Sequence, residues 1–242
     1  MFKHKILIIF FPFILWTQLY GQKETTLNLP KFDHRFMHFG FLLGFNSADF
    51  RVQRFAKNEI GTGADSLFVL DHKSSAGFNL GIISALHLSP AFSLRFTPNL
   101  AFSSRSLIYN FETVEGAKQY TKIIESTLIN FPISVKYKSV RVNNFSAYLL
   151  TGGSYSIDLA SNAGIENVSN DPNDIIVAIK KSDYLAEVGF GTDFYLEYFK
   201  FGIEIKMSYG LKDLLDHDNT QFSSPIDKLN SKMFLLSLTF EG

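Results

Sequence analysis

Apolar residues alternate with small or polar residues along most of this chain. In the stretch FSLRFTPNLAF, residues 92–102, every even position is apolar, and the odd positions from 93 to 101 are small or polar. Successive side chains of a β-strand point to opposite faces, so the stretch predicts a strand with one apolar face and one face that accommodates Arg95. Pro98 cannot donate a ladder hydrogen bond, and we expect a bulge or a locally unpaired position there.

The same period of two predicts seven further strands. They lie at residues 39–46, 76–88, 127–137, 145–157, 184–196, 201–210 and 233–240. The pattern is weakest at 145–157, because Tyr148 and Leu150 interrupt the alternation. Beyond the amino terminus, no continuous apolar run is long enough for a spanning helix, so strands would carry any membrane role.

The connections between these strands alternate between long and short. Polar stretches, at 51–74, 160–181 and 211–230, follow the first, fifth and seventh strands. Short joints follow the second, fourth and sixth strands, at Ser89-Pro90, at 141–144 and around Tyr198. Long loops at one rim, short turns at the other and an even strand number are typical of bacterial outer-membrane barrels. The expected fold is therefore all-β: an eight-stranded antiparallel up-and-down transmembrane β-barrel with long extracellular loops and short periplasmic turns.

A soluble eight-stranded barrel of the lipocalin type would also have alternating strands, with the apolar face inside. Two features favour the membrane barrel. The polar face is rich in glycine, serine and alanine, as a narrow closed interior requires, whereas the apolar face carries many of the 26 phenylalanines. Tyrosines near the strand ends match the aromatic girdles of membrane barrels. They are Tyr137, Tyr155, Tyr184 and Tyr209.

The first 21 residues have the layout of a secretory signal peptide. Two lysines precede an apolar run from Ile6 to Trp16, and a polar stretch follows up to Gly21. A membrane anchor is the alternative, but the run is shorter than the roughly 20 residues of a spanning helix and contains Pro12. We expect residues 1–21 to be removed, residues 22–35 to form a periplasmic lead-in and candidate contact strip, and residues 36–242 to form the barrel.

Charged residues on the polar face of the strands form a candidate site in the lumen. They are Arg95, Lys136, Glu187, Asp193, Glu204 and Lys206. An eight-stranded barrel has room only for its own side chains, so we expect opposite charges that neutralise one another as a structural filler. A proton or ion relay is the alternative. A turn centred near residues 198 and 199 predicts that Asp193 lies opposite Glu204. Lys206 on the diagonal, with Arg95 from a nearby wall of the barrel, would then hold both carboxylates ionised.

The remaining composition argues against several functions. The chain has 23 basic and 23 acidic residues, so no net field recruits nucleic acid. It has no cysteine, which excludes disulfides, thiolate chemistry and a lipoprotein anchor. Acyl transfer would need a histidine next to a serine, and the sequence identifies no such pair. An alternative role for the histidines is a metal site in which His72 and His217, from two separate long loops, are joint ligands. We expect no catalytic residue, no cofactor, no metal and no small-molecule substrate.

Three stretches resemble the PorT family, also called SprT, of outer-membrane proteins from Bacteroidetes. They are NLPKFDHRFMHFGFLLGFNSADF, INFPISVKY and GFGTDFYLEYFKF, and they occur in the order of that family. The resemblance implies an outer-membrane location and a non-catalytic part in the type IX secretion system, and in gliding motility where that is present. Expected partners are outer-membrane lipid and other type IX components. A generic small barrel with a structural or adhesive loop surface is the alternative.

Overall fold

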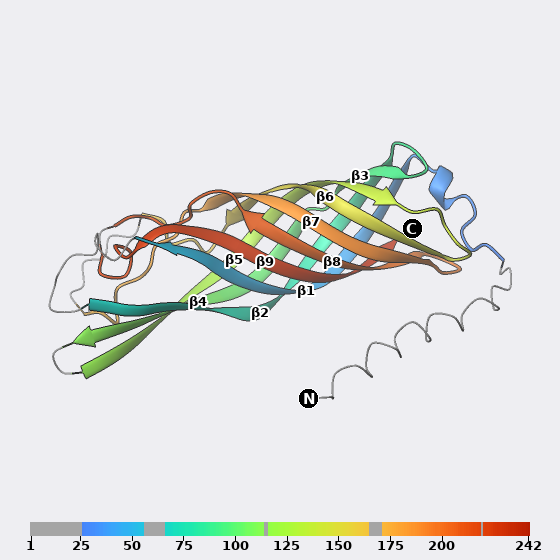
Figure 1. Cartoon of the computed structure of the whole chain (residues 1–242). Coiled ribbons are helices and arrows are strands. Elements are labelled where there is room, and N and C mark those ends of the chain that lie inside the picture. Colours follow the sequence, from blue (N-terminus) through green and yellow to red (C-terminus); the bar gives the residue numbers. More distant parts are fainter. Residues whose placement is uncertain (1–25, 56–65, 114–115, 165–170, 219) are drawn as a thin grey trace, which may run out of the picture.

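The computed structural model describes residues 26–55, 66–113, 116–164, 171–218 and 220–242 (Figure 1). The expected signal peptide, residues 1–21, lies outside them. In this part of the chain no helix is long and apolar enough to cross a membrane. A short 3₁₀ turn at Phe32–His34 precedes the strands. The strands are β1 (Met37–Arg54), β2 (Ser66–His87), β3 (Phe92–Phe96), β4 (Asn99–Thr113), β5 (Gly116–Lys138), β6 (Phe145–Asp158), β7 (Ser182–Tyr195), β8 (Lys200–Gly210) and β9 (Ile226–Glu241).

The strands form one closed antiparallel ring. β1 pairs with both β2 and β9, which joins the two ends of the sheet. β3 and β4 are consecutive halves of one strand, since both pair with β2 and β5. The nine segments therefore make eight barrel strands, and the expected eight-stranded up-and-down barrel is confirmed. The predicted stretches lie within the observed strands, except at residues 88, 97–98 and 196.

The strand that contains Pro98 is interrupted at Thr97 and Pro98, so of the two expected alternatives the locally unpaired position is observed and the bulge is not. The residues on either side of the gap keep the same register with β2, so none is inserted. The carbonyl oxygen of Pro98 accepts a hydrogen bond from the Ile82 amide (3.0 Å), and the Thr97 amide donates to the carbonyl oxygen of Pro132 (3.2 Å). The missing proline amide thus removes ladder hydrogen bonds locally without a shift in register.

Several strands extend beyond the ring at the end of the long connections (Figure 1). β2 and β4 stay paired out to Ser66 and Glu112, and β4 and β5 stay paired to the turn between them. Parts of the stretches 51–74 and 211–230, expected to be loops, are therefore strand. Their backbone groups find partners across the sheet, which a polar composition alone does not reveal.

The two faces of the ring differ as the alternation predicts. Phe96 points outward and is 41% exposed, whereas its neighbour Arg95 points inward and is 1% exposed. Exposed apolar side chains cover the outside of every strand, and serine, asparagine and glycine are frequent inside. Gly152 shows why small residues are needed there, since an added Cβ would collide with the carbonyl oxygen of Ile133.

Phe96→Arg should lower the free energy of unfolding by about 2–4 kcal/mol, because the position lies near the middle of the outer apolar belt. Leu88→Arg is the matched control. Leu88 is exposed just beyond the end of β2, and an arginine near a membrane interface costs only about 0–1 kcal/mol. Reversible urea unfolding from lipid vesicles measures both changes. Equal, small losses at the two positions would contradict a lipid-facing outer surface.

Candidate functional site: a filled lumen with two closed ends

Ion pairs fill the lumen near the short turns. Arg95 Nη1 lies 2.7 Å from Glu204 Oε2, and Lys136 Nζ lies 2.7 Å from Asp193 Oδ2. All four side chains are buried. A buried charge is costly unless it is paired and hydrogen-bonded, so each of these groups depends on its partner.

A third pair joins the remaining two residues of the predicted cluster. Lys206 Nζ lies 3.0 Å from Glu187 Oε2, and the Ser208 hydroxyl donates to Glu187 Oε1 (3.2 Å). Lys206 directly faces Gly189 across the β7–β8 ladder, and Glu187 lies on the diagonal. The glycine leaves the lysine side chain free to reach across to Glu187.

The expected position of Asp193 opposite Glu204 is wrong. Asp193 lies opposite Gly202. The turn of residues 196–199 is centred between Glu197 and Tyr198, one residue earlier than assumed, and this shifts every β7–β8 pair by two residues. The two carboxylates therefore do not face each other, and each takes its cation from another strand.

Two further members of the charged cluster, Lys200 and Glu241, are not predicted from the sequence. Lys200 Nζ lies 2.9 Å from Glu241 Oε2 and 3.7 Å from Asp193 Oδ2, and all three side chains are buried. Their positions carry a usable signal, because Lys200 has the inward parity of Lys206 on β8, and Glu241 has that of Ser237 on β9. Both residues lie at strand ends, where the alternation is shortest and easiest to overlook.

Tyr148, which interrupts the alternation of β6, belongs to the same cluster. Its hydroxyl donates to Glu204 Oε2 (3.1 Å), and Lys136 Nζ lies 3.6 Å from the centroid of its ring. The bulky ring fits inside because Gly191 stands opposite it on β7, where a Cβ would collide with the phenol. Tyr148 thus links the first two ion pairs.

Asparagines from four strands form a hydrogen-bonded row across the lumen beyond the ion pairs. Asn46 Nδ2 donates to Asn79 Oδ1 (2.5 Å). Asn79 Nδ2 and Asn130 Nδ2 both donate to Asn99 Oδ1, at 3.2 and 3.0 Å. All four side chains are buried. The row fills the middle of the barrel with amide groups that hydrogen-bond to one another.

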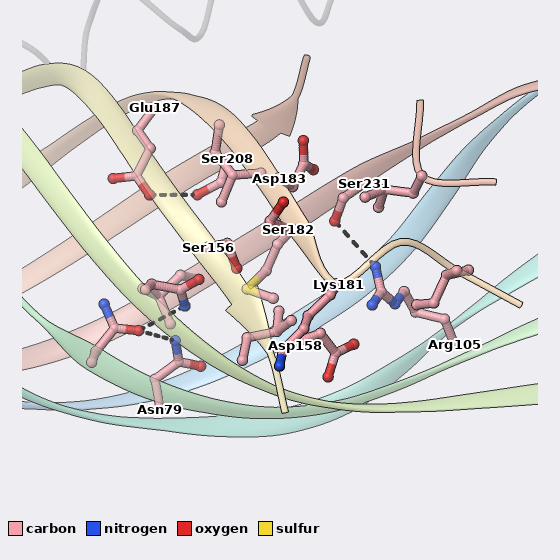
Figure 2. A pocket seen from close by; sticks show the side chains of 18 of the residues that line it. Asn79, Arg105, Ser156, Asp158, Lys181, Ser182, Asp183, Glu187, Ser208 and Ser231 are labelled. Atoms are coloured by element: carbon pink, nitrogen blue, oxygen red, sulfur yellow. Dashed lines mark hydrogen bonds between the residues drawn. The ribbon is translucent and has the colours of Figure 1, made fainter. Parts of the chain in front are cut away.

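A cavity of about 30 Å³ lies between this row and the long-loop end (Figure 2). Asp158 and Asp183 line it together with Arg105. Arg105 is buried and donates through Nη1 to Ser231 Oγ (3.1 Å) and through Nη2 to Ser126 Oγ (2.6 Å). Such a volume holds about two water molecules, so the cavity does not serve as a path for solutes.

An apolar core, which we call the lid, closes the long-loop end. Its members come from the outer parts of five strands and from the connections 175–179 and 211–225. They are Phe50, Leu70, Leu107, Tyr109, Phe111, Ile124, Val177, Ile179, Leu214, Leu215, Phe222, Ile226 and Leu229. The Phe222 ring lies 4.9 Å from that of Tyr109 and 5.8 Å from that of Phe111, centroid to centroid. These connections, expected to be polar loops, contribute instead to a packed cap.

Residues 26–36, which we call the latch, close the short-turn end (Figure 1). Phe32 is buried there, and its ring stacks on His38 with the centroids 3.8 Å apart. Lys200 Nζ lies 4.7 Å from the centroid of the Phe32 ring. His87 and Tyr195 meet the ring edge-on, at 6.5 and 6.1 Å. The described part of the expected lead-in is thus docked into the barrel mouth.

Polar contacts reinforce the latch. Asp33 Oδ1 lies 2.6 Å from Lys138 Nζ and accepts a hydrogen bond from the Tyr195 hydroxyl (3.1 Å). The Asn28 amide donates to Asn144 Oδ1 (2.9 Å). Burial opposes the charge of Asp33, but the Lys138 ammonium and the Tyr195 hydroxyl outweigh it and hold the pKa of this carboxyl below its usual value.

The two surface histidines considered as metal ligands have other partners. His72 Nδ1 lies 2.8 Å from Asp49 Oδ1, and His217 Nε2 lies 3.1 Å from Asp213 Oδ2. Among the residues that the structure describes, no group of three or more histidine, aspartate or glutamate side chains is arranged to hold a metal.

Lys206→Met should lower the free energy of unfolding by about 3–5 kcal/mol, because it leaves Glu187 buried without its cation. Adding Glu187→Gln should restore most of that loss. The matched control adds Glu204→Gln instead, which removes the partner of Arg95 and should deepen the loss. Urea unfolding in lipid vesicles compares the three variants, and rescue by Glu204→Gln in place of Glu187→Gln would contradict the observed pairing.

Phe32→Ala should release the latch. A buried phenylalanine contributes about 3–5 kcal/mol relative to alanine, and cleavage of a segment that opens locally follows its opening equilibrium. Trypsin should then cut after Lys31 and Arg35 at least about a hundredfold faster. Val140→Ala, at an exposed position between β5 and β6 and outside the latch, should leave the rate unchanged. Similar cleavage rates in the two variants would mean that Phe32 does not hold the segment.

Comparison with known proteins places the chain among outer-membrane barrels. Residues 20–216 match the family described as outer membrane protein beta-barrel domain. No curated protein matches the chain in sequence. Solved structures similar to it include Neisserial surface protein A, with 13% identity over 84% of this chain and 95% of that chain (TM-score 0.45). They also include OprG from Pseudomonas aeruginosa, with 9% identity over 85% and 94% (TM-score 0.42), and Ail from Yersinia pestis, with 12% identity over 86% and 100% (TM-score 0.40). Because the family match covers most of its length, this chain belongs to the outer membrane protein beta-barrel domain family.

Proposed function

We propose that this chain is a non-catalytic structural or assembly component of the type IX export apparatus, and of the gliding machinery in bacteria that have one. The observation that carries the proposal is where the three PorT-like stretches lie. They are residues 28–50, 129–137 and 189–201, and each contributes residues to the short-turn end of the barrel, although the first also continues along β1 to Phe50 in the lid. We call this end, with the latch docked in it, the periplasmic mouth.

Direct contacts join the three stretches. Phe32 of the first packs against Tyr195 and Lys200 of the third. Lys136 of the second forms an ion pair with Asp193 of the third. Features needed only to build a lipid-facing strand would not have to converge on one end. Their convergence supports a function carried by the periplasmic mouth, where components on that side of the membrane could dock.

The filled lumen supports a role in contact over a role in passage. The two ion pairs nearest the short turns, the asparagine row and the lid succeed one another along the barrel, and the Lys206–Glu187 pair lines the same cavity as the row. Cargo would therefore pass beside this barrel and not through it. The part of the barrel in export would be to hold or assemble other components.

A second candidate, a generic barrel with a structural or adhesive loop surface, is favoured by a different observation. β2, β4 and β5 continue as a paired sheet beyond the ring, and the lid gives that end a fixed shape. Such a surface suits contact with material outside the cell.

Deleting the gene distinguishes the two candidates. Under the first, release of type IX cargo into the medium should stop, and the wild-type chain should restore it. Pull-down of a tagged chain from its own membranes should recover other export components, and Phe32→Ala should reduce their yield. A deletion strain that exports normally but adheres poorly would favour the loop-surface function.

The double variant Lys206→Met/Glu187→Gln separates a structural filler from a relay. If the lumen charges only fill space, the double variant should support export as well as the wild type, because neutral side chains of similar size fill it too. Cargo release is measured at matched levels of the barrel in the outer membrane. A variant that assembles normally and exports nothing would make the charges part of the mechanism.

A further inference from the structure

We propose that the latch binds anionic phospholipid headgroups at the membrane surface beside the periplasmic mouth. Its inner side is fixed on the barrel by Phe32 and Asp33. Its outer side presents Lys31, His34 and Arg35, all exposed. A segment that would otherwise be free is thereby converted into a fixed basic surface.

Backbone hydrogen bonds set the arrangement of these basic residues. The Phe32 amide donates to the carbonyl oxygen of Leu29 (3.0 Å), and the His34 amide donates to that of Lys31 (3.3 Å). The Arg35 amide donates to the carbonyl oxygen of Phe32 (3.2 Å). The cations are thus held close together before any ligand arrives, so binding loses little conformational entropy of the chain.

The carboxylates near the latch leave its basic residues largely unneutralised. Asp33 is engaged by Lys138 at 2.6 Å, and Glu241 is buried against Lys200 at 2.9 Å. Glu197, in the turn between β7 and β8, is exposed. Within the described part of the chain, neither Lys31 nor Arg35 forms an ion pair. Among the described side chains at this end, two permanent cations and a histidine therefore stand against one exposed side-chain carboxylate, and the surface attracts anions.

Apolar side chains lie beside the basic ones. Phe36 is 70% exposed and Leu27 is 56% exposed. Met37 and Phe39 follow directly and begin the outward apolar belt on β1. Basic and aromatic residues at the edge of such a belt lie at the level of lipid headgroups. The phosphates would then contact the cations while the acyl chains cover Phe36.

This combination favours a phospholipid over other anions. A free phosphate would meet the cations but leave Phe36 in water. An acidic protein would meet the cations but would have to share the surface with the lipid that covers Phe39. An anionic phospholipid satisfies both groups at once, and each lysine or arginine near an anionic membrane surface raises affinity about fivefold.

A single tryptophan on the latch can report which lipid surrounds it. Trp16 is the only tryptophan of the chain and lies in the expected signal peptide, so Leu27→Trp gives the chain from residue 22 onward a single reporter. The protein is placed in vesicles of equal parts phosphatidylcholine and phosphatidylglycerol, with bromine carried by one lipid or the other. Brominated phosphatidylglycerol should quench the tryptophan fluorescence more strongly than brominated phosphatidylcholine. The binding constant for phosphatidylglycerol relative to phosphatidylcholine should be about 5 if one of Lys31 and Arg35 contacts the lipid, and about 25 if both do.

Matched charge changes test the residues. Lys31→Gln/Arg35→Gln should bring the relative binding constant to about 1. Lys73→Gln/Lys228→Gln, which removes two exposed lysines from the other end of the barrel, should leave it unchanged.

All variants are checked for folding by their heat-modifiable migration on gels. Equal quenching by the two lipids in the parent, or an unchanged preference in Lys31→Gln/Arg35→Gln, would overturn the proposal. Adding inorganic phosphate at constant ionic strength should leave the preference for phosphatidylglycerol in place. If the preference disappeared, the proposal would also be overturned, because the latch would then bind the phosphate anion and not the lipid.

Discussion

Backbone hydrogen bonding in apolar surroundings is the constraint on which the rest of this structure depends. Hydrocarbon offers no partner to an unpaired amide or carbonyl group, so strands persist there only in a closed ring. The long pairing of β1 with β9, from Gly40 opposite Glu241 to Arg54 opposite Ile226, removes the two free edges. A ring of this size encloses little more than its own side chains, and this small interior then decides which residues fit inside. Gly191 opposite Tyr148 and Gly189 opposite Lys206 are local results of that limit.

The same small interior explains how the charges are arranged. An ion sealed from water costs several kcal/mol unless a partner compensates it. Arg95, Lys136, Lys200 and Lys206 each have a carboxylate oxygen within 3.0 Å. Arg105 differs, because it donates to two serine hydroxyls and its guanidinium lies 4.3 Å from the centroid of the Phe50 ring, beside a cavity that can hold water. Near the short-turn end the lumen is therefore neutral pair by pair, which suits a filler, since a relay needs a group that is free to gain or lose a proton.

The alternation of side chains predicts the strands and their faces because both follow from the geometry of a single strand. It does not predict which charges meet. That depends on register, and a turn centred one residue earlier moves Asp193 from Glu204 to Gly202. The latch is harder still, since residues 26–36 have no periodicity and their contacts join positions more than a hundred residues apart, as Asn28 with Asn144 does. The lid could not be predicted for a related reason: Leu215 and Phe222 lie in polar stretches that show no period of two, and only the folded chain brings them together.

The lid and the latch close the barrel by different physical means, and the difference decides which end can change. The lid buries thirteen apolar residues in the described part of the chain, and each large one contributes about 1.5–3 kcal/mol on burial. The latch has one comparable anchor, Phe32, with the partly exposed Asp33–Lys138 pair, and such pairs contribute about 0–1 kcal/mol. Local opening concentrates where few apolar contacts resist it, so the latch should open far more often than the lid. The ion pair of Lys136 with Asp193 and the contact of Phe32 with Tyr195 lie at this same end. An exchange of contacts there, between the latch and a partner or a lipid, is the rearrangement that this fold permits with the least loss of stability.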